Sequence, residues 1–103
     1  MTPVEVLKAA REKIAQGWTQ GSYAKDVLGL PDGGKHAVSF CSVGAMWAVE
    51  RDICKVEVAC EAFRRALPRK WISITDWNDA PSRTKKQVLD TFDKAIELAG
   101  TQS

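Results

Sequence analysis

The sequence predicts a mainly α-helical fold, a compact four-helix domain that also contains a long glycine-rich irregular segment. Two observations lead to this prediction. Apolar residues recur at intervals of three and four in several separate stretches, which is the period of a helix with one buried face. Five of the seven glycines fall between residues 17 and 34, where they would interrupt any long helix. With 103 residues, the chain fits a single domain that spans residues 1–103.

The composition excludes several classes of protein. Hydrophobic residues make up 45% of the chain and charged residues 27%, as in ordinary globular proteins. The net charge of +2 is too small to indicate a nucleic-acid or anionic-membrane partner through bulk electrostatics. No stretch approaches the roughly 18 apolar residues that cross a bilayer, and the N-terminus lacks the basic-then-apolar order of a secretion signal. We therefore expect a cytoplasmic protein with no membrane partner.

The first helix is predicted at residues 3–16. Thr2 and Glu5 match a capping box, and Pro3 occupies the first helical position. Gly17 stands where a helix-terminating glycine is usually found. The apolar stripe between these signals consists of Val4, Leu7, Ala10 and Ile14.

Residues 17–37 are predicted to be irregular. Pro31-Asp32-Gly33-Gly34 indicates a turn, because proline presets φ and glycine accepts positive φ. Residues 22–24 and 27–28 are candidates for short extended pieces. A small hairpin could form from this irregular segment or from residues 71–75. A loop of this length in a compact domain is more often functional or locally structured than a plain linker.

A second helix is predicted at residues 39–51 and a third at residues 55–67. The second is apolar nearly all round, which is typical of a central, buried helix. Its Gly44 and Ala45 would let a neighbouring helix approach closely. Pro68 stops the third helix. The apolar stripe of the third helix consists of Val56, Ala59, Cys60, Phe63 and Leu67.

The C-terminal third of the chain is predicted to hold an extended piece, a turn and a fourth helix. Residues 71–75 alternate between apolar and polar, as a short strand does. Residues 77–82 would form the turn, with Asp79 or Ser82 as the cap of the helix that follows. That helix is expected to end at Gly100. Its amphipathic stripe consists of Val88, Leu89, Phe92, Ala95, Ile96 and Ala99.

Three groups of residues resemble those of a known family. The groups are Trp18-Thr19-Gln20-Gly21-Ser22-Tyr23-Ala24, Phe40-Cys41-Ser42-Val43-Gly44-Ala45, and Trp77-Asn78-Asp79 followed by Arg83-Thr84. In order and spacing they are similar to a family of small uncharacterised proteins found in bacterial and phage genomes, over roughly residues 5–99. The resemblance implies a shared fold and a phage or prophage origin, and it implies no activity.

The third group provides the first candidate binding site. Trp77 could stack on a flat ligand while Asn78, Asp79 and Arg83 supply hydrogen bonds to it. The structural alternative, which the frequency of such caps favours, gives these residues no ligand. In that alternative Asp79 caps the following helix, Arg83 pairs with Asp79, and Trp77 holds the turn on the core.

The first group provides the second candidate. Trp18, Gln20 and Tyr23 would line the same groove as Trp77 if the glycine-rich segment folds back beside the turn. Alternatively, Trp18 and Tyr23 cover the end of the first helix, which is the commoner position for aromatic residues in a small protein.

A catalytic hypothesis rests on Cys41 and His36. The dipole of the second helix could stabilise the Cys41 thiolate, with His36 as the base. A buried cysteine and a loop histidine explain the same residues more simply, and the sequence contains no nucleophile elbow or phosphate loop. Cys41, Cys54 and Cys60 lack the short paired spacings of zinc sites, so we expect no metal. We expect the three cysteines to be small apolar core residues. We also expect no catalytic residue and no cofactor.

The densest basic run lies at residues 64–71. Its Arg64, Arg65 and Lys70 would form a nucleic-acid patch with Lys85 and Lys86 if the two segments share a face. The alternative is a solvated helix end, where cations interact favourably with the helix dipole. The sequence therefore favours, in order, a non-enzymatic protein that binds another protein or a small ligand, a nucleic-acid-binding accessory protein, and a cysteine-dependent enzyme.

Overall fold

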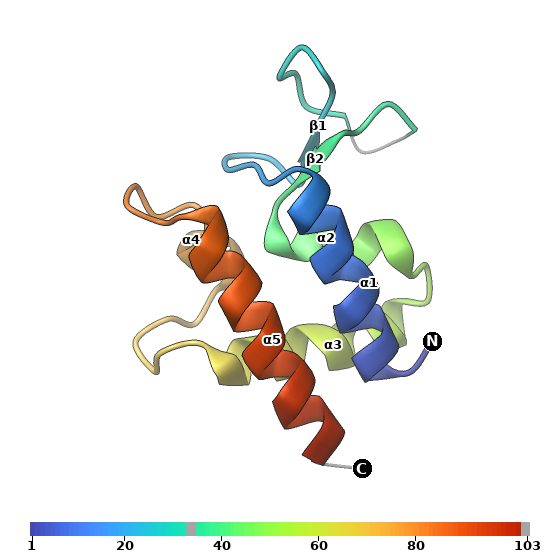
Figure 1. The fold of residues 1–103 in the computed structure, drawn as a ribbon, viewed down its shortest axis with the longest axis vertical. Coiled ribbons are helices and arrows are strands. Elements are labelled where there is room, and N and C mark those ends of the chain that lie inside the picture. The colour runs from blue at the N-terminus through green and yellow to red at the C-terminus, as the bar shows by residue number, and fades with distance from the viewer. Residues whose placement is uncertain (33–34, 102–103) are drawn as a thin grey trace.

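The computed structural model describes residues 1–32 and 35–101. In chain order, its elements are α1 (Pro3–Gln16), β1 (Ala24–Lys25), β2 (Ser39–Phe40), α2 (Ser42–Val49), α3 (Ile53–Ala66), α4 (Ile74–Asn78) and α5 (Lys85–Thr101). Figure 1 shows α1 and α5 side by side, α3 crossing behind them, and the two strands in an arm that projects from one end of the helical body. The mainly α-helical class is confirmed, and the four helices of eight or more residues match the predicted four-helix domain.

The start of α1 forms as the sequence predicts, and its end has a different cause. Thr2 Oγ1 accepts a hydrogen bond from Glu5 N at 3.1 Å, and Glu5 Oε1 accepts one from Thr2 N at 2.8 Å. These bonds hold the pKa of Glu5 below its usual value. Gly17 ends the helix in an extended conformation, with φ −173°, rather than in the left-handed conformation of a glycine cap. A Cβ on Gly17 would lie 2.2 Å from Val38 O, so glycine is required here for the close approach of two backbones.

The core lies where α1, α3 and α5 pack together, and Phe63 is at its centre. The Phe63 ring meets the Phe92 ring edge-on at 4.7 Å and the Trp77 ring at 5.7 Å. Such edge-to-face pairs add to the free energy of burying the rings. The largest fully buried apolar side chains are Phe63, Phe92, Leu7, Ile14, Met46, Val6, Val56 and Val88.

The arm contains a small hairpin, but its second strand, β2, lies in residues that were predicted to be helical. Ala24 of β1 lies opposite Phe40 of β2 in an antiparallel pair. Phe40 N also donates to Gly17 O at 2.9 Å, so the hairpin is fixed to the end of α1. Residues 27–28 form a turn rather than the predicted extended piece. Of the predicted turn at residues 31–34, Gly33 and Gly34 lie outside the described residues.

The prediction that residues 39–51 form a central, buried helix is wrong in two respects. Residues 39–40 belong to β2, and α2 lies on one side of the core with Trp47 42% exposed. The close approach at Gly44 is made by backbone outside any helix, since a Cβ there would lie 1.9 Å from Tyr23 O. A short helix with apolar residues on every face, such as α2, therefore need not be buried on every face.

The predictions for the C-terminal third of the chain need three corrections. Residues 74–78 form the helix α4, capped by Ser73, rather than a strand. Neither Asp79 nor Ser82 caps α5; Thr84 Oγ1 accepts from Gln87 N at 3.2 Å and Gln87 Oε1 accepts from Thr84 N at 3.0 Å. This reciprocal pair is a capping box. Finally, α5 continues through Gly100 to Thr101.

Candidate functional site

The three motif groups of the sequence meet around one buried side chain, that of Asn78. Its exposed fraction is 0%. Its Oδ1 accepts three hydrogen bonds, from Trp18 Nε1 at 2.9 Å, Ser42 N at 3.0 Å and Ser42 Oγ at 2.8 Å. Its Nδ2 donates to Thr19 O at 3.0 Å and to Asp79 Oδ1 at 2.9 Å. One amide thus joins segments that are 36 to 60 residues apart in the chain.

Gln20 and Gly21 extend this network along the chain. Gln20 Nε2 donates to Asn78 O and to Ala80 O, both at 2.9 Å. Gly21 N donates to Asp79 Oδ1 at 3.1 Å. We call the hydrogen-bonded set formed by residues 18–21, Ser42 and residues 78–80 the Asn78 network. Its buried side-chain polar atoms all have partners, since no such atom in the described residues is without one.

Trp77 and Arg83 form a second, adjoining contact. Trp77 is only 3% exposed and packs on the core, as the structural alternative predicts. The Arg83 guanidinium lies 4.2 Å from the Trp77 ring centre and 5.6 Å from that of Trp71, and its Nε donates to Trp77 O at 2.8 Å. The predicted ion pair between Arg83 and Asp79 is therefore wrong, because the guanidinium stacks on the indoles instead.

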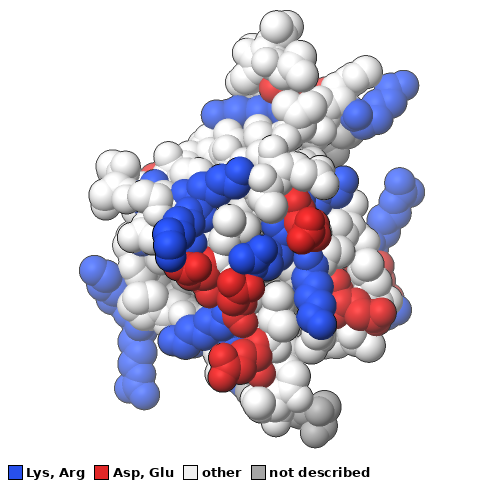
Figure 2. Space-filling view, in the orientation of Figure 1, with Lys and Arg blue, Asp and Glu red and all other residues white. Residues whose placement is uncertain are grey.

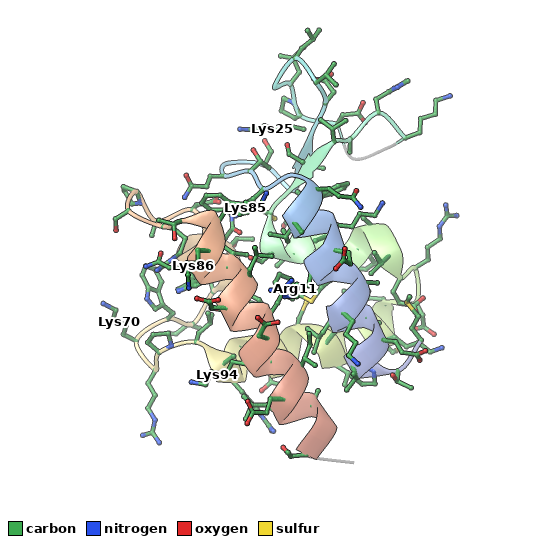
Figure 3. The ribbon with its side chains drawn as sticks, in the orientation of Figure 1. Arg11, Lys25, Lys70, Lys85, Lys86 and Lys94 are labelled. Carbon is green, nitrogen blue, oxygen red and sulfur yellow. The ribbon has the colours of Figure 1, made fainter. Side chains whose placement is uncertain are left out.

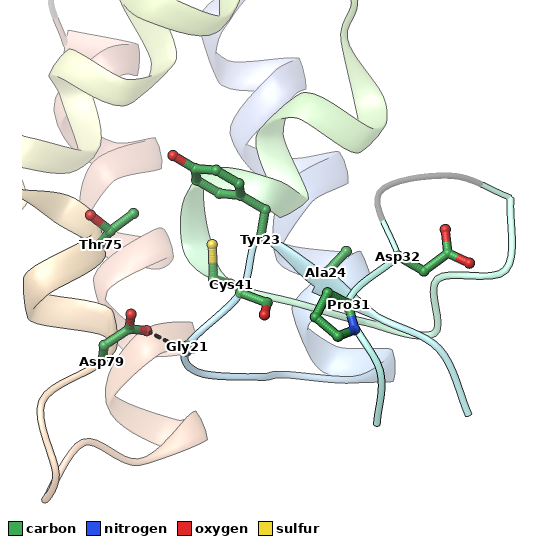
Figure 4. Close-up of a pocket in the computed structure, with 9 residues that line it drawn as sticks. Gly21, Tyr23, Ala24, Pro31, Asp32, Cys41, Thr75 and Asp79 are labelled. Carbon is green, nitrogen blue, oxygen red and sulfur yellow. Dashed lines mark hydrogen bonds between the residues drawn. The ribbon is translucent and has the colours of Figure 1, made fainter. Parts of the chain in front are cut away.

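A pocket of about 490 Å³ opens beside the Asn78 network (Figure 4). Its polar lining comes from Ser22, Asp32, Thr75 and Asp79. Gly21, Ala24 and Pro31 provide backbone and small apolar surface, and Tyr23 and Cys41 complete the lining. We call this the Tyr23 pocket.

Tyr23 is the most exposed aromatic residue of the site, with 62% of its surface accessible. Its backbone is nevertheless fixed, since Tyr23 O accepts from Cys41 N at 3.0 Å and packs against Gly44. On its other side, Tyr23 borders a smaller hollow of about 310 Å³ that Phe40 and Trp47 also line. An exposed side chain on a fixed backbone thus borders two hollows.

Of the seven residues proposed from the sequence, the structure brings Trp18, Gln20, Asn78 and Asp79 into one network. Tyr23 and Asp79 line the pocket, while Trp77 and Arg83 lie behind it in the core contact. The polar side chains of the pocket and network that were not proposed as binding residues include those of Ser22, Asp32, Ser42 and Thr75. Ser42 has a signal in the sequence, because it is a lone polar residue in an apolar run and is 0% exposed in the structure. Thr75 has none, because only the fold brings it to the pocket.

The cysteines differ in their surroundings. Cys41 caps α2, with its Sγ accepting from Gly44 N at 3.3 Å, and burial raises the pKa of its thiol. The alternative of a stabilised thiolate is therefore contradicted, since desolvation outweighs the hydrogen bond, and Cys41 is buried as the favoured prediction of a core cysteine requires. Burial likewise raises the pKa of Cys60 to about 11. Cys54 is exposed, contrary to the prediction of a core position, and no group of metal-binding side chains occurs in the described residues.

The basic residues of the alternative interface largely have partners of their own. Arg64 and Arg65 both pair with Glu61. Lys86 pairs with Asp90 at 2.7 Å, and Lys85 Nζ donates to Ala15 O at the end of α1. Figure 3 labels Lys70, Lys85 and Lys86, and Figure 2 shows acidic and basic side chains interleaved over the face that α1 and α5 form. This face therefore has no broad patch of one sign.

Comparison with known proteins places the chain in a family. A family model described as "Family of unknown function (DUF6197)" matches residues 1–98, so the chain belongs to this family. No curated protein and no solved structure matches it. None of the helices within residues 1–32 and 35–101 is both long and apolar enough to span a bilayer.

Proposed function

We propose that this member of the family is a non-enzymatic binding protein of the cytoplasm, and that the Tyr23 pocket is its binding site. The observation that carries the proposal is the Asn78 network. It fixes residues 18–21 against residues 78–80, and so it holds two walls of the pocket in one geometry. Recognition sites gain affinity when their walls are ordered before the ligand arrives.

The exposed Tyr23 ring supports the same conclusion. Tyrosine contributes large contact area at a small cost in conformational entropy, and it is enriched among residues that dominate binding. An exposed tyrosine on a loop is common, but here Tyr23 O accepts from Cys41 N, and the next residue, Ala24, pairs with Phe40. The partner we propose is another protein or a small ligand that covers this ring. A phage or prophage origin would make a host protein the natural partner.

The state of Cys41 supports a non-enzymatic role. A cysteine nucleophile acts as the thiolate, and a raised pKa lowers the thiolate fraction at neutral pH. We expect a thiol reagent at pH 7.5 to label the exposed Cys54 first, and Cys41 and Cys60 at least about tenfold more slowly. Mass spectrometry of a time course measures the three rates separately. Labelling of Cys41 as fast as that of Cys54 would contradict the assignment.

The binding site can be tested by NMR with ¹⁵N-labelled protein and a library of small organic fragments and short peptides. We expect ligand-induced shifts to concentrate on the amides of residues 21–24 and of Asp79. Tyr23→Ala should abolish these shifts without unfolding the protein, because the side chain is mostly solvent-exposed. Ile72→Ala, which removes an 83% exposed apolar side chain elsewhere, is the matched control and should change nothing. Shifts that spread evenly over the surface, or that survive in Tyr23→Ala, would refute the proposed site.

A nucleic-acid interface is the second candidate function, and one observation favours it. The half-exposed Trp71 ring has two cations near its centre, Lys70 at 5.8 Å and Arg83 at 5.6 Å. Single-stranded nucleic acids bind surfaces that combine aromatic rings with cations. The variant with Arg64, Arg65 and Lys70 all changed to alanine should lose retention on single-stranded DNA at low salt. If the wild-type protein is not retained there, this candidate is excluded.

A further inference from the structure

We propose that the Tyr23 pocket takes a positively charged nitrogen group, an alkylammonium or a guanidinium, and that Asp79 is the residue that selects it. This inference rests on the proposed binding function and specifies the chemistry of its ligand. It follows from the charges that line the pocket, the placement of the Asp79 carboxylate, and the exposed aromatic ring in the lining.

The charged residues in the described lining of the pocket are both acidic. Asp32 and Asp79 supply two carboxylates, and none of the described residues that line the pocket is a lysine, arginine or histidine. The remaining polar groups are the hydroxyls of Ser22 and Thr75 and the thiol of Cys41, whose raised pKa keeps it neutral at pH 7. An anionic ligand would meet like charge at close range, whereas a cation is attracted.

The Asp79 carboxylate is fixed in position before any ligand binds. Its Oδ1 accepts from Gly21 N at 3.1 Å and from Asn78 Nδ2 at 2.9 Å. Asn78 is itself held by hydrogen bonds from Trp18 and Ser42. A carboxylate offers about four acceptor positions on its two oxygens, so two bonds to Oδ1 leave capacity for a donor from a ligand. Figure 4 shows the carboxylate beside the Gly21 backbone at the pocket wall.

Within residues 1–32 and 35–101, no ion pair neutralises the Asp79 carboxylate. Arg83, which is four residues away and would be the natural partner, is held by the indole of Trp77 and its carbonyl oxygen. The stacking of Arg83 on the core thus leaves Asp79 available to a cation from outside.

Tyr23 provides the second element that a cation site uses. The face of an aromatic ring attracts ammonium and guanidinium groups through its quadrupole. Beyond Tyr23, the smaller hollow is lined by Phe40, Trp47 and small residues. We therefore expect the preferred ligand to carry an apolar or aromatic group next to its cationic one, as a small amine does or as a basic side chain does in a peptide.

The test compares probes that share a shape and differ in charge. n-Butylammonium and n-butylguanidinium are titrated against ¹⁵N-labelled protein beside n-butanol and butyrate. We expect the two cations to shift the amides of residues 21–24 with dissociation constants roughly tenfold lower than that of n-butanol, and butyrate not to bind. Two peptides, acetyl-Leu-Arg-Leu-amide and acetyl-Leu-Gln-Leu-amide, are titrated in the same way. They test whether the cation that binds is a basic side chain of a polypeptide. Tighter binding of the arginine peptide than of n-butylguanidinium assigns the site to a polypeptide, and the reverse assigns it to a small cation.

Asp79→Asn is the decisive variant, because an amide oxygen can still accept from Gly21 N and Asn78 Nδ2. We expect it to remove the preference for cations while amide protection at residues 18–21 is retained. Asp76→Asn, which changes an exposed carboxylate of α4 that does not line the pocket, should keep the preference.

The outcomes separate this inference from the proposed function. Equal binding of n-butanol and the cations, or tighter binding of butyrate, overturns the cation inference and leaves the Tyr23 pocket as a binding site. Retention of the cation preference in Asp79→Asn overturns the role of Asp79. If none of the probes perturbs residues 21–24, the cation inference fails, and the fragment and peptide screen decides the proposed function on its own.

Discussion

The helical core and the Asn78 network hold the same protein together by different physical means. In the core, α1, α3 and α5 bury apolar stripes around Phe63, and many side chains share the stabilisation. In the network, one amide makes five hydrogen bonds to residues from three parts of the chain. The core therefore stabilises the fold by burying apolar surface. The network fixes loops through directional hydrogen bonds, which depend on the single side chain of Asn78.

This difference assigns separate roles to the two regions. Hydrophobic burial is not directional, so it can fold a domain without placing a particular loop to within a fraction of an ångström. A satisfied buried polar network does place its members, since any other arrangement leaves buried polar groups without partners. The pocket lies beside the network and away from the core centre at Phe63, as a site that needs a fixed backbone would.

The largest expected effect comes from Phe63→Ala in the core. The ring is 0% exposed and contacts both Phe92 and Trp77. Its removal should lower the free energy of unfolding by about 3–5 kcal/mol, because it removes apolar burial and leaves a cavity. Urea denaturation followed by far-UV circular dichroism measures the loss. Val58→Ala on the same helix, where the side chain is 53% exposed, should change stability by less than about 0.5 kcal/mol.

Asn78→Ala is expected to have the next largest effect, about 2–4 kcal/mol. It leaves Trp18 Nε1 and the backbone and hydroxyl of Ser42 without their acceptor in a buried site. Hydrogen exchange should show that amides of residues 18–21 lose protection, while those of α1, α3 and α5 exchange only by global unfolding. A uniform loss of protection in all helices would mean that the network belongs to the core rather than to the site.

Asn78→Asp separates the two halves of the amide. The carboxylate keeps an acceptor for Trp18 and Ser42, but it cannot donate to Thr19 O and it places a second negative charge beside Asp79. We expect this variant to be as destabilised as Asn78→Ala at neutral pH, since a buried unpaired charge is costly. Wild-type stability in Asn78→Asp would show that the donor half of the amide is dispensable.

Gly44→Ala tests the contact that fixes Tyr23 and should cost about 1–3 kcal/mol. A Cβ there would lie 1.9 Å from Tyr23 O, which is backbone and cannot move without displacing β1 and the pocket wall. We expect weakened ligand shifts at residues 21–24 together with the lower stability. Gly100→Ala is the matched control, because nothing lies within 4 Å of its Cβ position and alanine is the better helix former. A neutral Gly44→Ala would show that the wall is loose.

The sequence predicted the parts of the fold that depend on local pattern. The limits of α1 were predicted at residues 3–16, because Thr2 and Gly17 mark the two ends within a few residues of the apolar stripe. α3 was predicted two residues late at its start, since Asp52 was not recognised as its cap. α2 was misjudged because composition alone cannot say which face of an apolar helix meets the core and which meets a loop.

The candidate site was only partly predictable, because its hydrogen bonds join residues that are far apart in the sequence. Trp18, Gln20, Asn78 and Asp79 stood out as polar and aromatic residues in turns, yet their bonds span 58 to 60 residues. No local rule specifies such a pairing. The Arg83 contact was mispredicted because spacing makes Asp79 its obvious partner, whereas only the fold places two indole rings within reach of the guanidinium.

Thr84→Ala is expected to have the smallest effect, lowering the free energy of unfolding by about 1 kcal/mol. It tests a cap formed by residues close in sequence, in contrast to the long-range hydrogen bonds of the Asn78 network. Thr84 and Gln87 form the capping box of α5, so the loss should be confined to the first turn of that helix. Ser82→Ala removes the cap that the turn sequence suggested and should be neutral, because no hydrogen bond of Ser82 caps α5. Thermal denaturation ranks the two variants, and hydrogen exchange at Val88 and Leu89 locates the fraying. If Ser82→Ala proves the more costly, α5 begins earlier in solution than at Lys85. The turn between α4 and α5 would then tighten toward Asp79, and the pocket wall would depend on a local cap as well as on Asn78.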